Sequence, residues 1–568
     1  MIMHRHTVQF CNIKAAAVAA LNSAVNPSMN HLAPFEVLSR YAPHQHTLAS
    51  LFETRARENP VRPFLIFNGT AWSWGEFAAA ANRLACALSA RGVHPGDRVA
   101  IMAGNSPAHL LLMFALARLR AIFVPVNPEF GVSEAGYVFN HAGVSAVICS
   151  DDTLGVVRQA IQTIQTITPR PWLALTSGNA PDAVDFDALW RGAPDTALPE
   201  DASADDTFII LYTSGTTGFP KGVMHSQKNF VLAGERHIER VHLQPDDRAL
   251  CVLPMFHNNA LFNITASTVA AGACMVLMPR FSASQFWRIV ASEGVTQVNV
   301  MAAVSTILAR RPRSEYVPGH HLRVVNGSGF TQETLDVFKN EFHVPTIIEG
   351  LGMTEIPGAF SIPFGSPYKL ACMGKLGRHP DHSKPWTEAR IVDDEGRDVT
   401  PGKVGEMLVR IPTMMQGYWR DAEQTAAAFR DGWFVTGDLV RRDAEGYYYH
   451  AGRKKDIIRR RGENISAAEV ERVLCEHPDV LQAAALPVAD DIGEEEIMAV
   501  CVAQPGAPLT ASDLHAWCAA RLAKFKVPRY VVFVEHLPHT PTHKVAKHAL
   551  KQDTAALRKK AVDLQTEP

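Results

Sequence analysis

The feature that most constrains the fold is an apolar run that ends in a loop of hydroxyl residues and glycines. Phe208-Ile209-Ile210 has the composition of a buried strand, and Lys221 closes the loop that follows it. Glycines let backbone N–H groups approach an anion closely, hydroxyls add donors, and lysine adds a fixed positive charge. We therefore expect a strand that leads into a polyphosphate-binding loop, with the binding residues Thr213, Ser214, Gly215, Thr216, Thr217, Gly218 and Lys221.

An ordinary surface loop rich in serine, threonine and glycine is the alternative interpretation. The run over residues 213–218 is unbroken and closely follows a buried strand, which favours a ligand. In a Walker P-loop the lysine is followed by a Ser or Thr that binds magnesium, whereas Lys221 is followed by Gly222. The sequence therefore disfavours a P-loop kinase or ATPase.

Length and composition indicate a multidomain globular protein. A chain of 568 residues exceeds what one hydrophobic core usually serves, so two or more domains are expected. The formal charge of −2 gives no general attraction to nucleic acid or to an anionic membrane. The nine cysteines are scattered without a CxxC pair, which favours free thiols in a reducing, cytoplasmic compartment. The most apolar segment, residues 109–125, is interrupted by Arg118 and Arg120, so no membrane-spanning helix is expected.

Residues 1–46 are predicted to form a flexible N-terminal extension. The first acidic residue is Glu36, and the Ala-rich patch at 15–20 resembles an organellar transit peptide only poorly, since the segment holds little arginine or serine. A disordered extension, or a start codon read upstream of Met29, explains the segment better.

From residue 47 onward, segments with strand and helix patterns alternate. Helices are predicted to begin at Thr47 and Ser73, and strands to cover 62–67, 98–102 and 145–149. This alternation implies an α/β fold with mostly parallel sheets covered by helices. The polar, acidic residues 169–206 are expected to form a surface connection. Later strands open into glycine turns near 327 and 350, the position at which open α/β sheets bind nucleotides.

The C-terminal third changes character. Short, closely spaced strands at 389–393, 405–410 and 446–450 predict a small β subdomain, and the charged stretch 452–462 resembles a linker. A compact α+β domain is expected beyond it. Its predicted elements are helices at 466–475, with Ser466 as N-cap and Glu469 at the capping-box position, and at 509–522, and strands at 480–488, 497–502 and 530–534. The charged tail after Leu550 is expected to fray.

The phosphate loop and several later motifs resemble the signatures of the adenylate-forming superfamily, which contains acyl-CoA synthetases, luciferases and the adenylation domains of peptide synthetases. The resemblance extends from about Thr47 to Leu550. It implies an adenylation (AMP-binding) domain at 47–452, a hinge at 453–456 and a mobile C-terminal domain at 457–555, with a tail at 556–568. In the family the C-terminal domain rotates at the hinge, where Lys455 stands here, between two half-reactions.

The resemblance also implies roles for single residues. Asn326-Gly327-Ser328-Gly329-Phe330 resembles the adenine-site turn, and Leu351-Gly352-Met353-Thr354-Glu355 resembles a motif whose Thr contacts the α-phosphate and whose Glu holds Mg²⁺. A carboxylate beside a triphosphate makes physical sense with a hard cation between them. Asp438, in a Thr-Gly-Asp motif, would bind the ribose hydroxyls, and Arg453 would reach the ribose or a phosphate. The implied nucleotide-binding residues are Gly327, Ser328, Gly329, Leu351, Gly352, Met353, Thr354, Asp438, Arg453 and Lys544, besides the phosphate loop.

The catalytic lysine implied by the resemblance is Lys544, in a C-terminal loop over residues 537–547, with Lys547 as a weaker competitor. The chain departs from the family pattern at two positions. His543 replaces the usual Gly before the lysine, which restricts the loop backbone. Leu351 replaces the usual Tyr, so aromatic stacking on adenine is lost and weaker nucleotide affinity is expected.

The acyl site is less defined by the sequence. His257 lies where the family has a gate over the substrate carboxylate, but a lone histidine is equally compatible with a structural role. No carboxylate occurs in residues 256–262, whereas amino-acid-activating relatives place an Asp there, which favours a plain acyl substrate. Residues 281–287 and 524–528 look most like the crotonobetaine/carnitine–CoA ligase branch, a likeness that does not identify the acid.

The function implied by the resemblance is that of an acyl-CoA synthetase, an ATP-dependent acid–CoA ligase that requires Mg²⁺. It would form acyl-AMP and pyrophosphate and then acyl-CoA, with a carboxylic acid, ATP and CoA as its partners and no nucleic acid. The oligomeric state is open, with a homodimer as one option. One alternative keeps adenylation but passes the acyl group to another acceptor, such as a carrier-protein thiol, or oxidises it. The other is a catalytically weak nucleotide-binding protein, motivated by Leu351 and His543.

Overall fold

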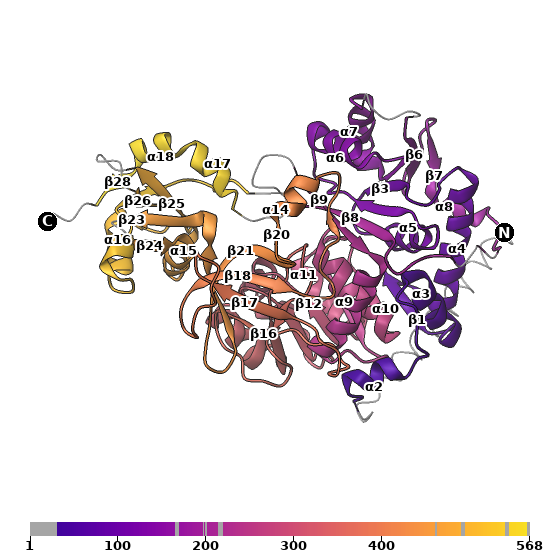
Figure 1. Ribbon diagram of the computed structural model, residues 1–568, viewed down its shortest axis with the longest axis horizontal. Helices are drawn as coiled ribbons and strands as arrows, with labels where there is room; N and C mark the ends of the chain where they lie inside the picture. Colours follow the sequence, from indigo (N-terminus) through magenta and orange to yellow (C-terminus); the bar gives the residue numbers. More distant parts are fainter. Residues whose placement is uncertain are drawn as a thin grey trace. The chain divides into compact units, whose positions relative to one another are not determined.

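The computed structural model describes residues 31–164, 170–196, 198, 201–213, 220–460, 463–489, 495–539 and 545–564. The chain forms two compact units (Figure 1). Of the described residues, those up to 213, 220–388 and 411–426 form the large unit, and 389–410 and those from 427 onward form the small unit. Within the described chain, no helix combines the length and apolarity that crossing a membrane would need.

The first sheet of the large unit has seven strands, and their burial fits the β-branched and apolar composition of the segments that form it. All neighbours pair in parallel except β1 and β2, which form an antiparallel hairpin. In spatial order the strands are β14 (Thr346–Glu349), β13 (Val324–Gly327), β12 (Gln297–Asn299), β10 (Arg248–Cys251), β11 (Cys274–Leu277), β1 (Pro63–Phe67) and β2 (Thr70–Ser73).

The second sheet has eight strands and carries the phosphate loop. In spatial order they are β19 (Gly417–Tyr418), β9 (Lys221–Ser226), β8 (Thr207–Thr213), β4 (Ile122–Pro125), β3 (Arg98–Met102), β5 (Ala146–Cys149), β6 (Trp172–Leu175) and β7 (Ala183–Asp185). Strands β8 and β9 pair antiparallel, with Thr213 opposite Lys221. The two strands therefore form a hairpin, and helix α9 (Gln227–Val241) follows β9.

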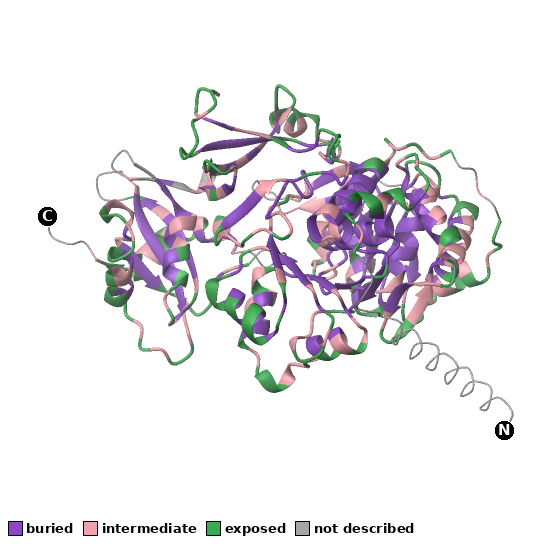
Figure 2. Cartoon of the chain, turned by 90° about the horizontal axis from the view of Figure 1, so that it is seen from below, coloured by how far each residue is buried: buried purple, intermediate pink, exposed green. Residues whose placement is uncertain are grey.

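Helices surround and separate these sheets. One hydrophobic cluster joins strands of both sheets to the intervening helices, for example Leu65, Phe123, Leu111 and Phe230. The buried positions lie on the strands and on the inner faces of the helices (Figure 2). The α-helices are α2 (Pro34–Ser39), α3 (Leu48–Glu58), α4 (Trp74–Ala90), α5 (Pro107–Arg118), α6 (Val132–Ala142), α7 (Asp151–Gln162), α8 (Phe186–Arg191), α9 (Gln227–Val241), α10 (Ala266–Ala271), α11 (Ala283–Ser292), α12 (Ala302–Arg310), α13 (Gln332–Asp336) and α14 (Ala422–Ala427).

Shorter elements complete the large unit. They are π-helical segments at Asn259–Thr265 and Val337–Glu341, a 3₁₀ turn at Arg313–Glu315, and the antiparallel pair β15 (Phe360–Ser361) and β16 (Cys372–Leu376). The predicted helix starts are confirmed, because the side chains of Thr47 and Ser73 accept hydrogen bonds from Ser50 N and Glu76 N.

Two expectations for the large unit are corrected. The surface connection predicted at 169–206 instead contains β6, β7 and α8, with Phe186 buried; their polar and Pro-rich flanks obscured these short elements. Of the predicted N-terminal extension, residues 1–30 lie outside the described chain. Residues from Pro34 to Ser39 form α2, whose Val37 is fully buried, so this part of the extension is folded.

The small unit begins with the predicted β subdomain, in the order β22 (Tyr448–Arg453), β21 (Trp433–Arg442), β18 (Gly405–Arg410) and β17 (Glu388–Val392), with β20 (Phe429–Arg430) paired to β21. The α+β part follows. It contains a 3₁₀ turn at Lys454–Asp456, β23 (Ile457–Arg460), β24 (Glu463–Ser466), α15 (Ala467–Cys475), β25 (Val480–Ala489), β26 (Glu495–Ala503), α16 (Ala511–Ala519), a 3₁₀ turn at Lys524–Lys526, β27 (Tyr530–Phe533), α17 (Lys547–Gln552), α18 (Thr554–Lys560) and β28 (Val562–Asp563).

Two expectations for the small unit are also corrected. The stretch read as a linker contributes to β22 and β23, so its described part is largely regular structure. The tail expected to fray after Leu550 forms α18 and the edge strand β28, which pairs with β27. The predicted N-cap Ser466 is confirmed, whereas Glu469 pairs with Lys526 at 2.8 Å. The hinge at 453–456 and the domain boundaries around it stay predictions.

Candidate active site

The phosphate loop is described only at its two ends. Thr213 closes β8 and Lys221 opens β9, and both side chains are half-buried. The predicted binding residues Ser214, Gly215, Thr216, Thr217 and Gly218 lie outside the described residues, as does Lys544. The hairpin nevertheless fixes where the loop begins and ends, because the two strands are in register up to the pair Thr213 and Lys221.

The glycine turn after β13 is fastened to the neighbouring strand by a residue that sequence reasoning missed. Gly329 has a left-handed φ of 76°, and its N–H donates to Glu349 Oε1 at 2.6 Å. Glu349 ends β14, is 9% exposed and also accepts the hydroxyl hydrogen bond of Tyr368. Burial raises the pKa of Glu349, although these hydrogen bonds oppose the rise. The predicted residues Gly327, Ser328 and Gly329 are therefore held in one turn at the carboxyl ends of the parallel strands.

The loop that contains Leu351, Gly352, Met353 and Thr354 follows β14. Gly352 is required sterically, since a Cβ there would lie 2.7 Å from the backbone nitrogen of Gly358. The carbonyl of Thr354 accepts the Nε2–H of His225, at 2.7 Å.

His225 lies on β9 and is held in turn by α9. Asn229 Nδ2 lies 3.0 Å from His225 Nδ1 and 2.7 Å from Met414 O, so it donates to the ring nitrogen and to the carbonyl. Complete burial lowers the pKa of His225 to about 4, which keeps the ring neutral near pH 7. The strand that begins with Lys221 thus also supports Thr354. No sequence pattern indicates this contact, since His225 lies in an ordinary strand pattern.

The Glu355 side chain is half-buried. Tyr418 donates its hydroxyl hydrogen bond to Glu355 Oε1 at 3.0 Å, and the backbone N–H of Met415 donates to the Glu355 carbonyl at 2.8 Å. No further hydrogen bond or ion pair of this carboxylate occurs among the described residues. A carboxylate held by one neutral donor, with its other oxygen unused, is a suitable ligand for Mg²⁺.

His257 lies in the loop after β10. Its backbone N–H donates to Pro254 O at 3.0 Å, its carbonyl accepts from Leu261 N, and its half-buried ring lies 4.3 Å from that of Phe256. These contacts hold the loop at the start of the first π-helical segment. The predicted role of His257 over a substrate carboxylate stays a prediction.

The small unit brings two predicted ligand-binding residues together. Asp438 is 1% exposed, and its Oδ1 lies 2.6 Å from Arg453 Nε and 3.3 Å from His450 Nε2. Thr436 supports it, because its hydroxyl accepts the Asp438 N–H at 3.0 Å and donates to Met407 O. Asp438 Oδ2 is buried and has no hydrogen-bond partner within the described chain. A buried, unpaired acceptor is costly unless a ligand donor, such as a ribose hydroxyl, reaches it.

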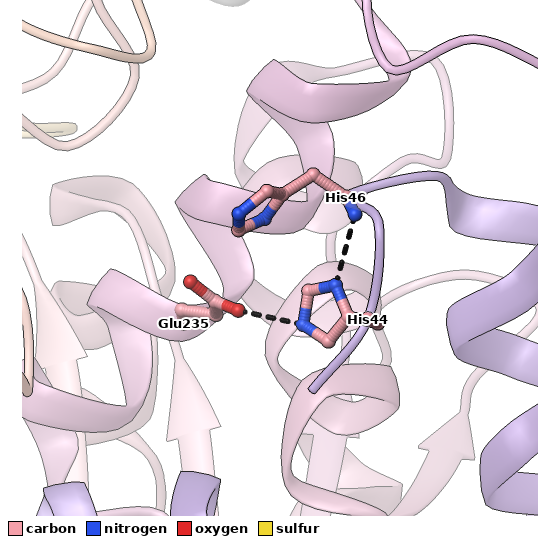
Figure 3. Close-up of side chains that lie close together, drawn as sticks. All are labelled: His44, His46 and Glu235. Atoms are coloured by element: carbon pink, nitrogen blue, oxygen red, sulfur yellow. Dashed lines mark hydrogen bonds and ion pairs between the residues drawn. The ribbon is translucent and has the colours of Figure 1, made fainter. Parts of the chain in front are cut away.

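A second cluster of titratable groups, outside the predicted site, joins three chain segments. His44, His46 and Glu235 offer ligand atoms within 4.8 Å of one another (Figure 3). The Nε2 atoms of His44 and His379 each lie 2.9 Å from a different oxygen of Glu235. The backbone N–H groups of His46 and Asp381 donate to the Nδ1 atoms of these two rings.

These backbone hydrogen bonds decide what the cluster can bind. Since each Nδ1 accepts, each Nε2 carries the ring proton and donates it to Glu235. A ring nitrogen must be unprotonated to bind a metal, and its other nitrogen then normally donates. The rings of His44 and His379 have the opposite proton arrangement. These two rings and the buried carboxylate of Glu235 therefore form a closed hydrogen-bond network.

A parallel α/β fold with a glycine turn at its strand ends, and a carboxylate in each unit with an oxygen left for a ligand, is typical of the class of nucleotide-binding proteins. The chain belongs to the AMP-binding enzyme family, which it matches over residues 52–419. Residues 469–544 match the AMP-binding enzyme C-terminal domain. Both matches agree with the superfamily that the sequence motifs suggested.

The similarity extends over most of the chain. It is 33% identical to an indoleacetate–CoA ligase of Aromatoleum aromaticum, over 89% of this chain and 98% of that protein. It is 30% identical to a crotonobetaine/carnitine–CoA ligase of Salmonella agona, over 83% of this chain and 91% of that protein. The ATP-bound structure of MatB from Rhodopseudomonas palustris superposes with a TM-score of 0.79 at 27% identity, over 89% of this chain and 98% of that one. The predicted α/β fold with a small C-terminal domain is thereby confirmed.

Proposed function

We propose that the protein is an ATP-dependent acid–CoA ligase that forms an acyl-adenylate and then an acyl-CoA. The observation that carries the proposal is the similarity along nearly the whole chain to proteins named as CoA ligases, including both the AMP-binding part and its C-terminal domain. The two relatives act on different acids, indoleacetate and crotonobetaine or carnitine. We therefore propose only the class of the substrate, which is a carboxylic acid that does not need an α-amine.

The proposed chemistry follows from charge. An oxygen of the substrate carboxylate forms a bond to the α-phosphorus of ATP, the bond from that phosphorus to the bridging oxygen breaks, and pyrophosphate leaves. Because two anions must meet, cationic groups and N–H donors are needed around the phosphates. Lys221 and Lys544 would supply the cationic side chains, and Mg²⁺ on Glu355 would add charge neutralisation. The thiol of CoA then attacks the acyl carbon, loses its proton, and releases AMP.

Asp438 and Arg453 are the proposed nucleotide-binding residues of the small unit. The unpaired Oδ2 of Asp438 would accept a ribose hydroxyl, while Arg453 keeps the other carboxylate oxygen occupied. Lys547, the alternative to Lys544 as the catalytic lysine, pairs with Glu471 at 2.7 Å, an ion pair that supports a structural role for it. A cytoplasmic location, expected from the scattered cysteines, is part of the same proposal.

The test is pyrophosphate release from MgATP across a panel of arylacetic, fatty and betaine acids, with and without CoA, followed by mass analysis of thioesters. We expect pyrophosphate with at least one acid and the matching acyl-CoA when CoA is present. Lys544→Ala should slow adenylation about 100-fold or more, because the transition-state charge loses a partner. The control Lys547→Ala should leave adenylation within about threefold. Pyrophosphate without thioester would refute CoA as the acceptor, and no pyrophosphate with any acid would refute the ligase.

A further inference from the structure

A short segment around β19 connects the phosphate-loop strand to the metal-binding carboxylate. The backbone N–H of Met415 donates to the carbonyl of Glu355 at 2.8 Å. One and four residues further on, the N–H groups of Gln416 and Trp419 donate to the carbonyls of Met224 and Gly222 on β9, at 2.9 and 2.7 Å. Residues 415–419 therefore hold the Glu355 loop and β9 at a fixed spacing.

Tyr418 lies in the middle of this segment and contacts both functional side chains. Its hydroxyl donates to Glu355 Oε1 at 3.0 Å, and Lys221 Nζ lies 5.0 Å from the centroid of its ring. The side chain is well packed, since the residue is only 8% exposed.

This arrangement keeps two opposite charges available for a ligand. Lysine carries a compact charge on a flexible stem, and a direct ion pair with Glu355 would remove both groups from the phosphates and the cation. No ion pair joins Lys221 and Glu355 in the described structure. The aromatic face attracts the ammonium group, while the hydroxyl occupies only one carboxylate oxygen. The other oxygen thus stays available to a metal ion.

We propose that Tyr418 is a positioning residue that holds Glu355 for Mg²⁺ with its hydroxyl and Lys221 for the phosphates with its ring. The inference rests on the proposed function, because it assumes that MgATP is the ligand of this site. It assigns separate roles to two parts of one side chain. The two roles can therefore be removed one at a time.

The experiment measures ATP binding by calorimetry at a series of Mg²⁺ concentrations and in EDTA, for the wild type, Tyr418→Phe and Tyr418→Leu. Tyr418→Phe should raise the Mg²⁺ concentration for half-maximal enhancement of binding about fivefold to tenfold, because a hydrogen bond to the charged carboxylate is lost. Its affinity for ATP in EDTA should stay within about twofold, since the ring is kept. Tyr418→Leu should also weaken binding in EDTA by about threefold to fivefold, because Lys221 loses its aromatic contact.

Tyr41→Phe is a matched control. The Tyr41 hydroxyl donates to Ala271 O at 3.0 Å, and Arg55 lies 3.5 Å from the ring centroid, so the substitution removes a similar buried hydroxyl under a similar cation. It should lower the melting temperature without changing the Mg²⁺ dependence. An unchanged Mg²⁺ dependence in Tyr418→Phe, with or without a lower melting temperature, would overturn the inference. If the wild type itself does not bind MgATP, the proposed function has failed instead.

Discussion

Two glutamates of the large unit show how differently the same side chain is used. Glu235, on α9, is 4% exposed, and each of its oxygens lies 2.9 Å from an imidazole Nε2, one from His44 and one from His379. Glu355, after β14, is half-buried, and its described partner is a single neutral donor, the hydroxyl of Tyr418 at 3.0 Å. Both carboxylates accept hydrogen bonds from side chains, but only Glu235 has its two oxygens bound by donors whose other ring nitrogen is held by a backbone N–H.

The difference separates a structural carboxylate from one that is proposed to bind Mg²⁺. Burial alone would raise the pKa of Glu235, but the hydrogen bonds from His379 and His44 lower it to about 2, so the charge is stabilised entirely within the protein. Such a saturated group has no capacity left for a ligand. Glu355 retains an oxygen for a hard cation, as expected of a functional site. The two residues should therefore respond in opposite ways to the same substitution.

The largest expected effect is that of Glu355→Gln on catalysis. The amide can still accept the Tyr418 hydroxyl, but it removes the anionic metal ligand, so adenylation should slow by about 100-fold or more. The free energy of unfolding should change by less than about 1 kcal/mol, because the side chain is half-buried and keeps its shape. Pyrophosphate release and urea denaturation measure the two quantities.

Asp443→Asn is a suitable control for this substitution. Asp443 also accepts a tyrosine hydroxyl, that of Tyr449 at 3.0 Å, but it lies in the turn between β21 and β22. The control should keep wild-type adenylation within about twofold. Equal losses of adenylation activity in Glu355→Gln and Asp443→Asn would show that the loss does not depend on a metal ligand at residue 355. The distinction between Glu355 and Glu235 would then be wrong.

The second effect is that of Glu235→Gln on stability. The amide NH₂ would face one of the imidazole Nε2–H groups, so a buried donor would meet a donor, and the free energy of unfolding should fall by about 2–3 kcal/mol. The matched control is Glu239→Gln, one turn along α9, whose partner His382 has a 58% exposed side chain. That pair should contribute less than about 1 kcal/mol. A similar loss in both variants, measured by urea denaturation, would show that the closed network has no special value.

The loss of stability in Glu235→Gln should depend on pH, because the pKa of Glu235 differs between the folded and unfolded states. The folded-state pKa of Glu235, about 2, lies below its ordinary value of 4.5, so its stabilisation is complete above pH 4.5. It is lost as the pH falls from 4.5 towards 2. The difference in unfolding free energy between wild type and Glu235→Gln should therefore be constant from pH 7 to 5 and shrink at pH 4 and below. A difference that grows on acidification would contradict the low pKa.

The sequence indicates candidate site residues more readily than the residues that support them. Thr354, Glu355 and the glycine turn are candidates because each lies in a contiguous motif at a strand end, and helix starts such as Thr47 follow from local capping chemistry. The supports come from distant segments: His225 is 129 positions from Thr354, and Tyr418 is 63 from Glu355. Periodicity and turn signals carry no information about such pairs.

The errors have a related cause. Strand β28 pairs two residues with β27 at a sheet edge, and β7 has only three residues, so neither gives a hydrophobic period that a sequence pattern can reveal. The hairpin formed by β8 and β9 was also unexpected, since a strand followed by a glycine loop usually precedes a helix in parallel α/β folds. In each case tertiary pairing, rather than local propensity, determines the element.

The smallest expected effect is a gain in ATP affinity when a new side-chain contact is added next to the proposed nucleotide site. Leu351 is half-buried, and its carbonyl accepts the N–H of Phe360 at 3.0 Å, so the backbone is held while the side chain can be changed. Leu351→Tyr should strengthen ATP binding by about 0.5–1.5 kcal/mol, or about twofold to tenfold, because an aromatic ring can stack on adenine. Leu370→Tyr, at a position that is 48% exposed, is the control and should leave the calorimetric dissociation constant unchanged. Unchanged or weaker binding in Leu351→Tyr would mean that residue 351 does not face the base. Tighter ATP binding, with the unfolding free energy unaltered, would show that the region around residue 351 can make a further contact to the ligand. The Glu235 network cannot, because both carboxylate oxygens are already bound.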